Sequence, residues 1–372
     1  MWSCRSSVPP CLPGEPPSEM RVSAKAAKDP GSGATLPEDS NMAWLVQPRL
    51  VNDPFSDPTL LLDFAFARRA LLFDLGDLAA LSAREIIRTT HVFVSHMHMD
   101  HFSGFDRLLR LNLYQPRTVH LIGPPGLCDA VAAKLAAYTW NLLGPNSADF
   151  RLIAEEWLPG APGGRSLFAA QEAFRRRELA PPARTGRILL EEGDFTVEAA
   201  LLDHGIPCLA FALQETLRVN VHRPALEAAG LPVGPWLTAA KQAMRRGAAE
   251  GTEIAIDAGR GVRLEWLRER GVLRAGPGQR ITYATDLGAS PGNVEALVSL
   301  ARGSDMLFIE AGFLAEDGAM AARKNHLTAA QAGGIARAAG VVHARPMHFS
   351  SRYAGREEAL RQEFAAAFGA AA

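Results

Sequence analysis

Four potential metal ligands lie within six residues of the sequence, in the segment SHMHMDHF at 95–102. This segment follows the apolar, β-branched run 91–95, which predicts a buried strand. A loop at the end of a strand can curl, so that His96, His98, Asp100 and His101 converge on one point. Imidazole and carboxylate groups suit zinc, manganese or iron. Because the whole chain contains 10 His, a chance cluster on a surface turn is the weaker interpretation, and we expect a metal site.

One loop rarely closes a metal site, so later parts of the chain must supply further ligands. Polar residues stand at the ends of three later predicted strands: His204 after 195–202, Asp286 after 281–285, and His348 at the end of 343–348. Layered α/β enzymes gather catalytic groups at such strand ends. Each residue taken singly could instead be a hydrogen-bonded structural residue. Together they would complete two metal positions.

Short apolar runs and helical periodicity predict a layered arrangement of strands and helices. Strands are expected at 60–66, 70–74, 91–95, 118–122, 195–202, 208–213, 281–285, 306–310 and 343–348, and helices at 127–142, 292–302 and 327–339. Strands dominate early and strand–helix alternation dominates late, which indicates sheets covered by helices, an α/β class. Residues 158–187 are interpreted as a surface insertion. The helical, polar stretch 215–278 is interpreted as an excursion from the core.

The composition is that of an ordinary globular enzyme. The 372 residues carry 39 Lys+Arg against 40 Asp+Glu, a net charge of -1, and 48% hydrophobic residues. These values exclude collagen, a coiled coil and a largely disordered chain, and argue against coating nucleic acid through charge alone. The 4 Cys form no disulfide framework, so we expect a reducing compartment, the cytoplasm. No apolar run is long enough to span a bilayer, so no membrane partner is expected.

The first 41 residues contain Pro, Gly, Ser and charged residues without apolar periodicity. Such a segment buries too little surface to offset the entropy of ordering, so we expect a disordered leader. The pattern changes sharply after Met42. We interpret Met42 as the true start, with a disordered tail as the alternative, and expect one domain over 42–372.

The metal-loop motif resembles the His-x-His-x-Asp-His signature of the metallo-β-lactamase fold. Further segments resemble, in order, the ribonuclease Z branch of that superfamily: LLFDLGD, HLIGPPGL, LLDHGIPCLAFAL, ITYATDLG, FIEAGF, NHLTAAQ and MHFSSRY. The resemblance covers about residues 60–355. It implies an αββα sandwich, in which two mixed β-sheets lie between helical layers.

The resemblance also implies a two-metal site. Its two divalent ions are expected to be zinc, with manganese or iron as alternatives, and to activate a water for in-line attack on phosphorus. The implied first-metal ligands are His96, His98 and His204, the second-metal ligands are Asp100, His101 and His348, and Asp286 bridges the two.

Two further residues, Glu310 and His326, match family residues near the scissile phosphate, and Asp100 would have a second role in orienting the water. His326 would donate a proton to the leaving oxygen, with Glu310 holding its ring. A helix-start residue facing solvent is the alternative for His326. Ser350 and Arg352 would bind substrate, since guanidinium grips phosphate well. An ordinary structural ion pair is the alternative for Arg352.

The sequence departs from the family pattern in several places. VNDPFSDP at 51–58 stands where the family has a Gly-rich loop that helps receive the RNA end. Ile309 and Gly312 replace a His and a Thr, Met99 replaces a Gly, and 158–187 is extra. The excursion at 215–278 resembles the arm that clamps tRNA in the family. A solvated helical pair that covers the site or forms a dimer contact is its alternative.

These observations lead to three hypotheses. The first is a phosphodiester hydrolase that removes the 3′ trailer of precursor tRNA and acts as a homodimer. The second is a hydrolase of the same fold that acts on a small phosphodiester, a cyclic nucleotide or a sulfate ester. The third is a binding protein that has kept the fold but lost catalytic turnover. The complete set of candidate metal ligands argues against this hypothesis.

Overall fold

The computed structural model describes residues 44–65, 67–184, 186–257 and 259–369. The expected leader at 1–41 and the expected start at Met42 lie outside these residues. Within them, no helix is long and apolar enough to cross a membrane.

The first sheet contains eight strands that lie side by side in chain order. Its middle strands, β3 to β6, run parallel to one another, and the outer pairs are antiparallel. Of the parallel strands, β3 is apolar and buried along its whole length, as expected for a strand covered on both faces, whereas β6 also carries the exposed Arg151. The strands are β1 (Val46–Leu50), β2 (Leu60–Phe64), β3 (Ala70–Phe73), β4 (Thr89–Phe93), β5 (Thr118–Gly123), β6 (Arg151–Glu156), β7 (Arg165–Ala169) and β8 (Arg176–Glu178).

The second sheet contains six strands in the order β18-β17-β16-β11-β10-β9. The pairs β16–β17 and β17–β18 are parallel, so their carboxyl ends share one edge of the sheet. The strands are β9 (Ile188–Glu192), β10 (Phe195–Asp203), β11 (Pro207–Glu215), β16 (Arg280–Ala284), β17 (Met306–Glu310) and β18 (His343–Met347).

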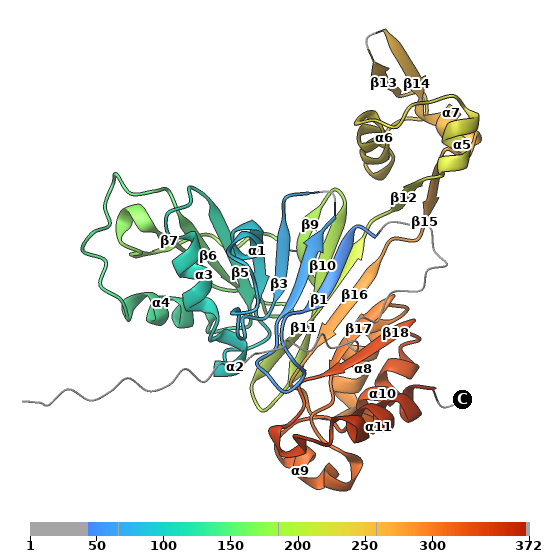
Figure 1. Ribbon diagram of the computed structural model, residues 1–372. Coiled ribbons are helices and arrows are strands. Elements are labelled where there is room, and N and C mark those ends of the chain that lie inside the picture. The colour runs from blue at the N-terminus through green and yellow to red at the C-terminus, as the bar shows by residue number, and fades with distance from the viewer. Residues whose placement is uncertain (1–43, 66, 185, 258, 370–372) are drawn as a thin grey trace, which may run out of the picture. The chain divides into compact units, whose positions relative to one another are not determined.

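Helices cover the outer face of each sheet (Figure 1). Three hydrophobic cores separate the four layers. The core between the two sheets contains the aromatic rings of Phe73, Phe211 and Tyr283. This arrangement confirms the expected αββα sandwich. The first sheet is covered by α1 (Ala83–Arg88), α3 (Phe105–Asn112) and α4 (Leu127–Ala136), and the second by α8 (Pro291–Ala301), α10 (Ala329–Ala338) and α11 (Glu357–Gly369).

The excursion between β11 and β16 has a hydrophobic core of its own, which includes Val219, Trp236 and Leu267. The expectation of a helical, polar stretch was therefore partly wrong, because four short stretches of mixed apolar and polar residues pair here as two antiparallel two-stranded ladders. Its strands are β12 (Arg218–Val221), β13 (Glu253–Asp257), β14 (Arg260–Arg263) and β15 (Leu273–Gly276), and its helices are α5 (Arg223–Ala228), α6 (Trp236–Arg245) and α7 (Leu264–Glu269). We call residues 216–278 the arm (Figure 1).

Two other expectations need correction. The insertion at 158–187 is not wholly a surface loop, because β7 and β8 extend the first sheet through antiparallel pairing. The helix expected over 127–142 ends at Ala136. There the indole Nε1 of Trp140 donates to the carbonyl of Leu135 at 2.8 Å and folds the chain back.

Candidate metal centre

The metal loop connects β4 to a single helical turn, α2 (Met99–Phe102). His98 is the N-cap residue of this turn, with extended backbone. Asp100 and His101 follow within the turn, so the tight reversal brings both side chains back toward His96. The three His rings lie in contact, with centroids 4.4 Å apart for His96–His98 and 4.3 Å for His96–His101.

The remaining candidates come from the second sheet, as the strand-end argument expected. His204 lies in the turn between β10 and β11, Asp286 follows β16, and His348 follows β18. Asp286 and His348 adopt left-handed backbone, with φ of 49° and 56°. Non-glycine residues rarely adopt this conformation, and such strain concentrates at functional sites.

Asp286 lies at the centre of the cluster. Its Oδ2 atom lies 3.4 Å from His96 Nε2, 3.3 Å from His101 Nε2 and 3.6 Å from His204 Nε2. His96, His98, His204 and Asp286 each place one potential ligand atom within 4.8 Å of the others. This group contains the residues expected to hold the first metal.

Asp286 also belongs to a second group, with Asp100, His101 and His348. Asp100 Oδ2 lies 3.4 Å from His101 Nε2 and 3.2 Å from His348 Nε2. His348 Nδ1 lies 3.1 Å from Asp286 Oδ1. The structure therefore places Asp286 between the two expected ligand sets.

The chemistry of these donors fits divalent cations. The Nε2 atoms of His96 and His101 are buried and have no hydrogen-bond partner, although a buried polar atom without a partner is costly. Burial opposes ionisation of Asp286, but the neighbouring His348 and His101 outweigh it and hold the pKa of this carboxyl well below its usual range. A buried carboxylate that faces unpartnered imidazole nitrogens is a set of groups that a metal ion would satisfy.

Asp74 is a buried residue of the site to which sequence reasoning assigned no role. Its Oδ2 atom accepts hydrogen bonds from Ser95 Oγ, His101 Nδ1 and Tyr283 Oη, each at 2.8 Å, and its Oδ1 accepts from Ser95 N at 2.6 Å. Because a carboxylate only accepts, His101 carries its proton on Nδ1 and turns Nε2 toward the cluster. The available signal was an acidic residue at the end of the apolar strand LLFD.

His326 lies beside the cluster and is held by Glu310. His326 Nδ1 lies 2.8 Å from Glu310 Oε2, and the other carboxylate oxygen accepts from Leu287 N at 2.6 Å. Glu310 is fully buried. Burial alone would lower the pKa of His326, but the hydrogen bond and charge of Glu310, with the charge of Asp286, raise it to about 9. At neutral pH a group with this pKa keeps its proton, so the ring of His326 is cationic.

Ser350 and Arg352 lie on the turn after His348, and neither contacts the cluster in the structure. Arg352 Nη1 lies 3.3 Å from Asp317 Oδ2. A structural ion pair of this kind was the alternative interpretation of Arg352. Ser350 N donates to the carbonyl of Gly312 at 3.1 Å.

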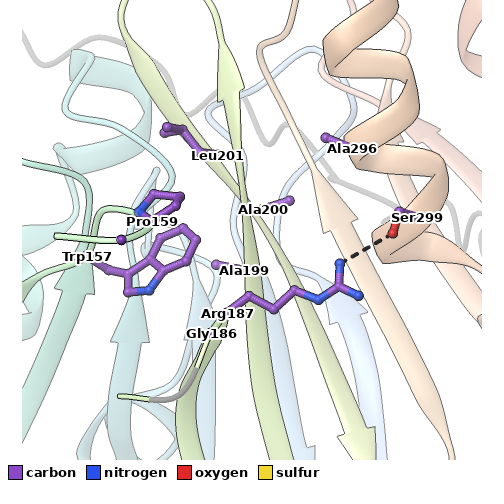
Figure 2. Close-up of a pocket in the computed structure, with 10 residues that line it drawn as sticks. Trp157, Pro159, Gly186, Arg187, Ala199, Ala200, Leu201, Ala296 and Ser299 are labelled. Carbon is purple, nitrogen blue, oxygen red and sulfur yellow. Dashed lines mark hydrogen bonds between the residues drawn. The ribbon is translucent and has the colours of Figure 1, made fainter. Parts of the chain in front are cut away.

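An open pocket lies apart from these residues, where β10 faces α8 and Trp157 (Figure 2). Arg187 Nη1 donates to Ser299 Oγ at 3.5 Å across it. None of the expected site residues lines this pocket.

The sandwich and the His- and Asp-rich cluster at its edge define a metal-dependent hydrolase of the metallo-β-lactamase fold. Ribonuclease Z of Deinococcus radiodurans is 35% identical to this chain over 303 residues, which cover 80% of the chain and 86% of that relative. Ribonuclease Z of Thermobifida fusca is 34% identical over 296 residues, 77% of each chain. The chain belongs to the ribonuclease Z family, as the resemblance in its motifs indicated.

The solved structures give weaker likenesses, and no family model matches the chain. The short form of human tRNase Z superposes with a TM-score of 0.45 at 19% identity, covering 84% of this chain and 91% of that one. The metallo-beta-lactamase fold protein YhfI of Bacillus subtilis has a TM-score of 0.47 at 15% identity, covering 84% and 85%.

Proposed function

We propose that this protein is a metal-dependent endoribonuclease that removes the 3′ trailer of precursor tRNA. The observation that carries the proposal is the pair of ligand groups that share Asp286, with the His326–Glu310 pair beside them. Two adjacent divalent sites with a proton donor suit the hydrolysis of a phosphodiester. Membership of the ribonuclease Z family supports precursor tRNA as the substrate.

We assign the ligands as the motif expects. One metal would be held by His96, His98 and His204, the other by Asp100, His101 and His348, and Asp286, which belongs to both groups, would be a ligand common to the two. The chemistry that a pair of divalent cations supplies is activation of water as a nucleophile at neutral pH and stabilisation of negative charge on phosphate. The histidine-rich ligand set favours zinc, with manganese or iron as alternatives.

The residues of the chain then position the reacting groups. The side chain of Asp100 is 40% exposed, so one carboxylate oxygen can accept a hydrogen bond from the attacking water. On the leaving-group side, His326 donates its proton to the departing oxygen, while Glu310 fixes the imidazole ring and stabilises its positive charge. Arg352 and Ser350 are proposed to contact substrate phosphate, for which Arg352 must leave Asp317.

The setting of the reaction is also a proposal. We propose a cytoplasmic enzyme because Cys128 and Cys208, the two cysteines within the part of the chain that the structure describes, are free and buried. We propose a homodimer on the strength of the family resemblance.

A small phosphodiester is the second candidate substrate, and the loop at 51–58 favours it. Where the family has a Gly-rich loop, Phe55 packs its ring 5.4 Å from that of Phe349, and Pro54 accepts a hydrogen bond from Phe349 N at 2.7 Å. This anchored loop lies directly beside the residue that follows His348.

Cleavage of a 3′-extended precursor tRNA with added zinc or manganese tests the proposal. We expect a cut just after the acceptor stem in the unchanged protein and none in His98→Ala. His343→Ala, at the opposite end of β18 from His348, is the matched control and should cleave normally. Turnover of bis(p-nitrophenyl) phosphate without any tRNA cut, at full metal content, would move the protein to the second candidate.

A further inference from the structure

Asn325 occupies a special backbone position immediately before His326. Its φ of 54° is left-handed. It follows α9 (Gly318–Arg323) and its C-cap residue Lys324. Asn325 N donates to the carbonyl of Ala322 at 3.2 Å, and His326 N donates to that of Ala321 at 2.9 Å. This pair of bonds defines a Schellman motif, whose left-handed residue is usually Gly and sometimes Asn.

The carbonyl of Asn325 contacts a proposed metal ligand. His204 Nδ1 lies 2.8 Å from Asn325 O. A carbonyl oxygen only accepts, so the ring proton of His204 lies on Nδ1, and Nε2 is left as the ligand atom facing Asp286. Bonds of this kind to metal-ligating His fix both the tautomer and the ring orientation.

The side chain of Asn325 fills the space between two turns of the site. A Cβ atom at Gly205, next to His204, would lie 3.0 Å from Asn325 Nδ2. A Cβ atom at Gly288, two residues after Asp286, would lie 3.5 Å from Asn325 Oδ1. Asn325 therefore packs against the turn that carries His204 and the turn that follows Asp286, and it directly precedes the proton donor.

We propose that Asn325 is a positioning residue whose left-handed backbone sets His204 and His326 together. In this conformation the carbonyl points to His204 while the next residue directs its ring to Glu310. A residue that avoids left-handed backbone would turn the carbonyl away and shift His326 with it. The role in turnover rests on the proposed function, whereas the role in holding His204 is tested by metal affinity alone.

Two substitutions at this position distinguish the effect of the backbone conformation from the effect of the side chain. Gly adopts left-handed backbone freely, whereas β-branched Val strongly resists it. We therefore expect Asn325→Gly, which keeps the backbone conformation but loses the side-chain packing, to lose much less zinc affinity and kcat than Asn325→Val. Asn325→Val should lower zinc affinity by about 10- to 100-fold, as loss of such a supporting bond typically does, and should lower kcat on bis(p-nitrophenyl) phosphate more than it raises KM.

Zinc affinity is measured on metal-free protein by competition with a chromophoric chelator. Ala173→Val is the matched control, because Ala173 also has left-handed backbone, with φ of 51°, but lies between β7 and β8. It should lower the melting temperature without changing zinc affinity. If Asn325→Val does not fold, Asn325→Ala carries the same test with a smaller strain, since Ala lacks the β-branch.

Two results would overturn the proposal. Unchanged zinc affinity in a folded Asn325→Val, or in the Ala variant that replaces it, would show that the carbonyl does not position His204. An Asn325→Gly as impaired as the Val variant would assign the effect to the amide side chain. Failure of the proposed function would give a different result: the unchanged protein would bind zinc normally but would not cleave precursor tRNA.

Discussion

Asp74→Asn is the substitution whose cost can be worked out most directly from the structure. Asp74 is fully buried and accepts four hydrogen bonds, three at Oδ2 and one at Oδ1. Asn has nearly the same shape but offers one acceptor oxygen and one NH₂ donor. The variant therefore changes hydrogen bonding and charge while it leaves the packing of the core intact.

The new side chain in Asp74→Asn costs least free energy when its amide oxygen takes the place of Oδ2, because three of the four donors face that position. The NH₂ group then faces the N–H of Ser95 at the Oδ1 position, so two buried donors oppose each other, at a cost of about 1 to 3 kcal/mol. The three remaining bonds become neutral, and each loses about 1 kcal/mol relative to a bond with a charged acceptor. Allowing for some relaxation, we expect a loss of about 3 to 5 kcal/mol in the free energy of unfolding.

Urea unfolding of the metal-free protein at pH 7.5 measures this loss. Asp63→Asn is the control, because its side chain is 38% exposed and pairs with Arg88 at the surface, where an ion pair contributes less than about 1 kcal/mol. Zinc affinity should fall by about 10- to 100-fold in Asp74→Asn alone, since His101 loses its charged partner. A loss of stability no larger than that of the control would refute the reasoning.

Three further predictions concern the proton donor, the arm and acid stability. His326→Ala should lower kcat by about 10²- to 10⁴-fold at normal zinc content, as loss of a general acid does; loss of zinc would mean that its role is misassigned. Residues 222–272 of the arm can be replaced by a Gly-rich turn, together with Glu215→Gln because the buried Glu215 loses its partner Arg245. This variant should cleave precursor tRNA more weakly and still hydrolyse bis(p-nitrophenyl) phosphate. Equal loss of both activities would indicate that the arm has a structural role. Burial, with nearby positive charge, lowers the pKa of His91 to about 3. The pKa of His91 is lower in the folded than in the unfolded protein, so the free energy of unfolding falls as pH drops below about 6.5, by about 2 kcal/mol at pH 5. His91→Gln should therefore lose less stability than the unchanged protein between pH 7.5 and 5. An equal shift of the urea midpoint in both proteins would contradict this.

The clustering of the candidate metal ligands was predictable because two local signals coincide. A run of His and Asp follows one apolar strand, and single polar residues follow three others. Parallel pairing of β16, β17 and β18 then brings Asp286 and His348 to the same edge. The layered α/β class followed from the same short apolar runs, and the αββα sandwich was implied by the family motifs.

The supporting residues were harder to predict because their roles depend on contacts distant in sequence. The hydroxyl of Tyr283 reaches Asp74 across the interface between the two sheets. The role of Asn325 depends on a left-handed φ and on a carbonyl, neither of which a side-chain pattern reveals. The strands of the arm were missed because stretches such as RVNV at 218–221 are too short to stand out from their charged surroundings.

The proposed metal ligands come from both halves of the sandwich, and this has a consequence for biosynthesis. His96, His98, Asp100 and His101 follow a strand of the first sheet, whereas His204, Asp286 and His348 follow strands of the second. During translation neither site can be complete before the two sheets have met, and the second site also waits for β18 to emerge. With these ligands, tight metal binding at both sites would be a late step that follows synthesis of β18, and a chain truncated before His348 would lack a ligand of the second site.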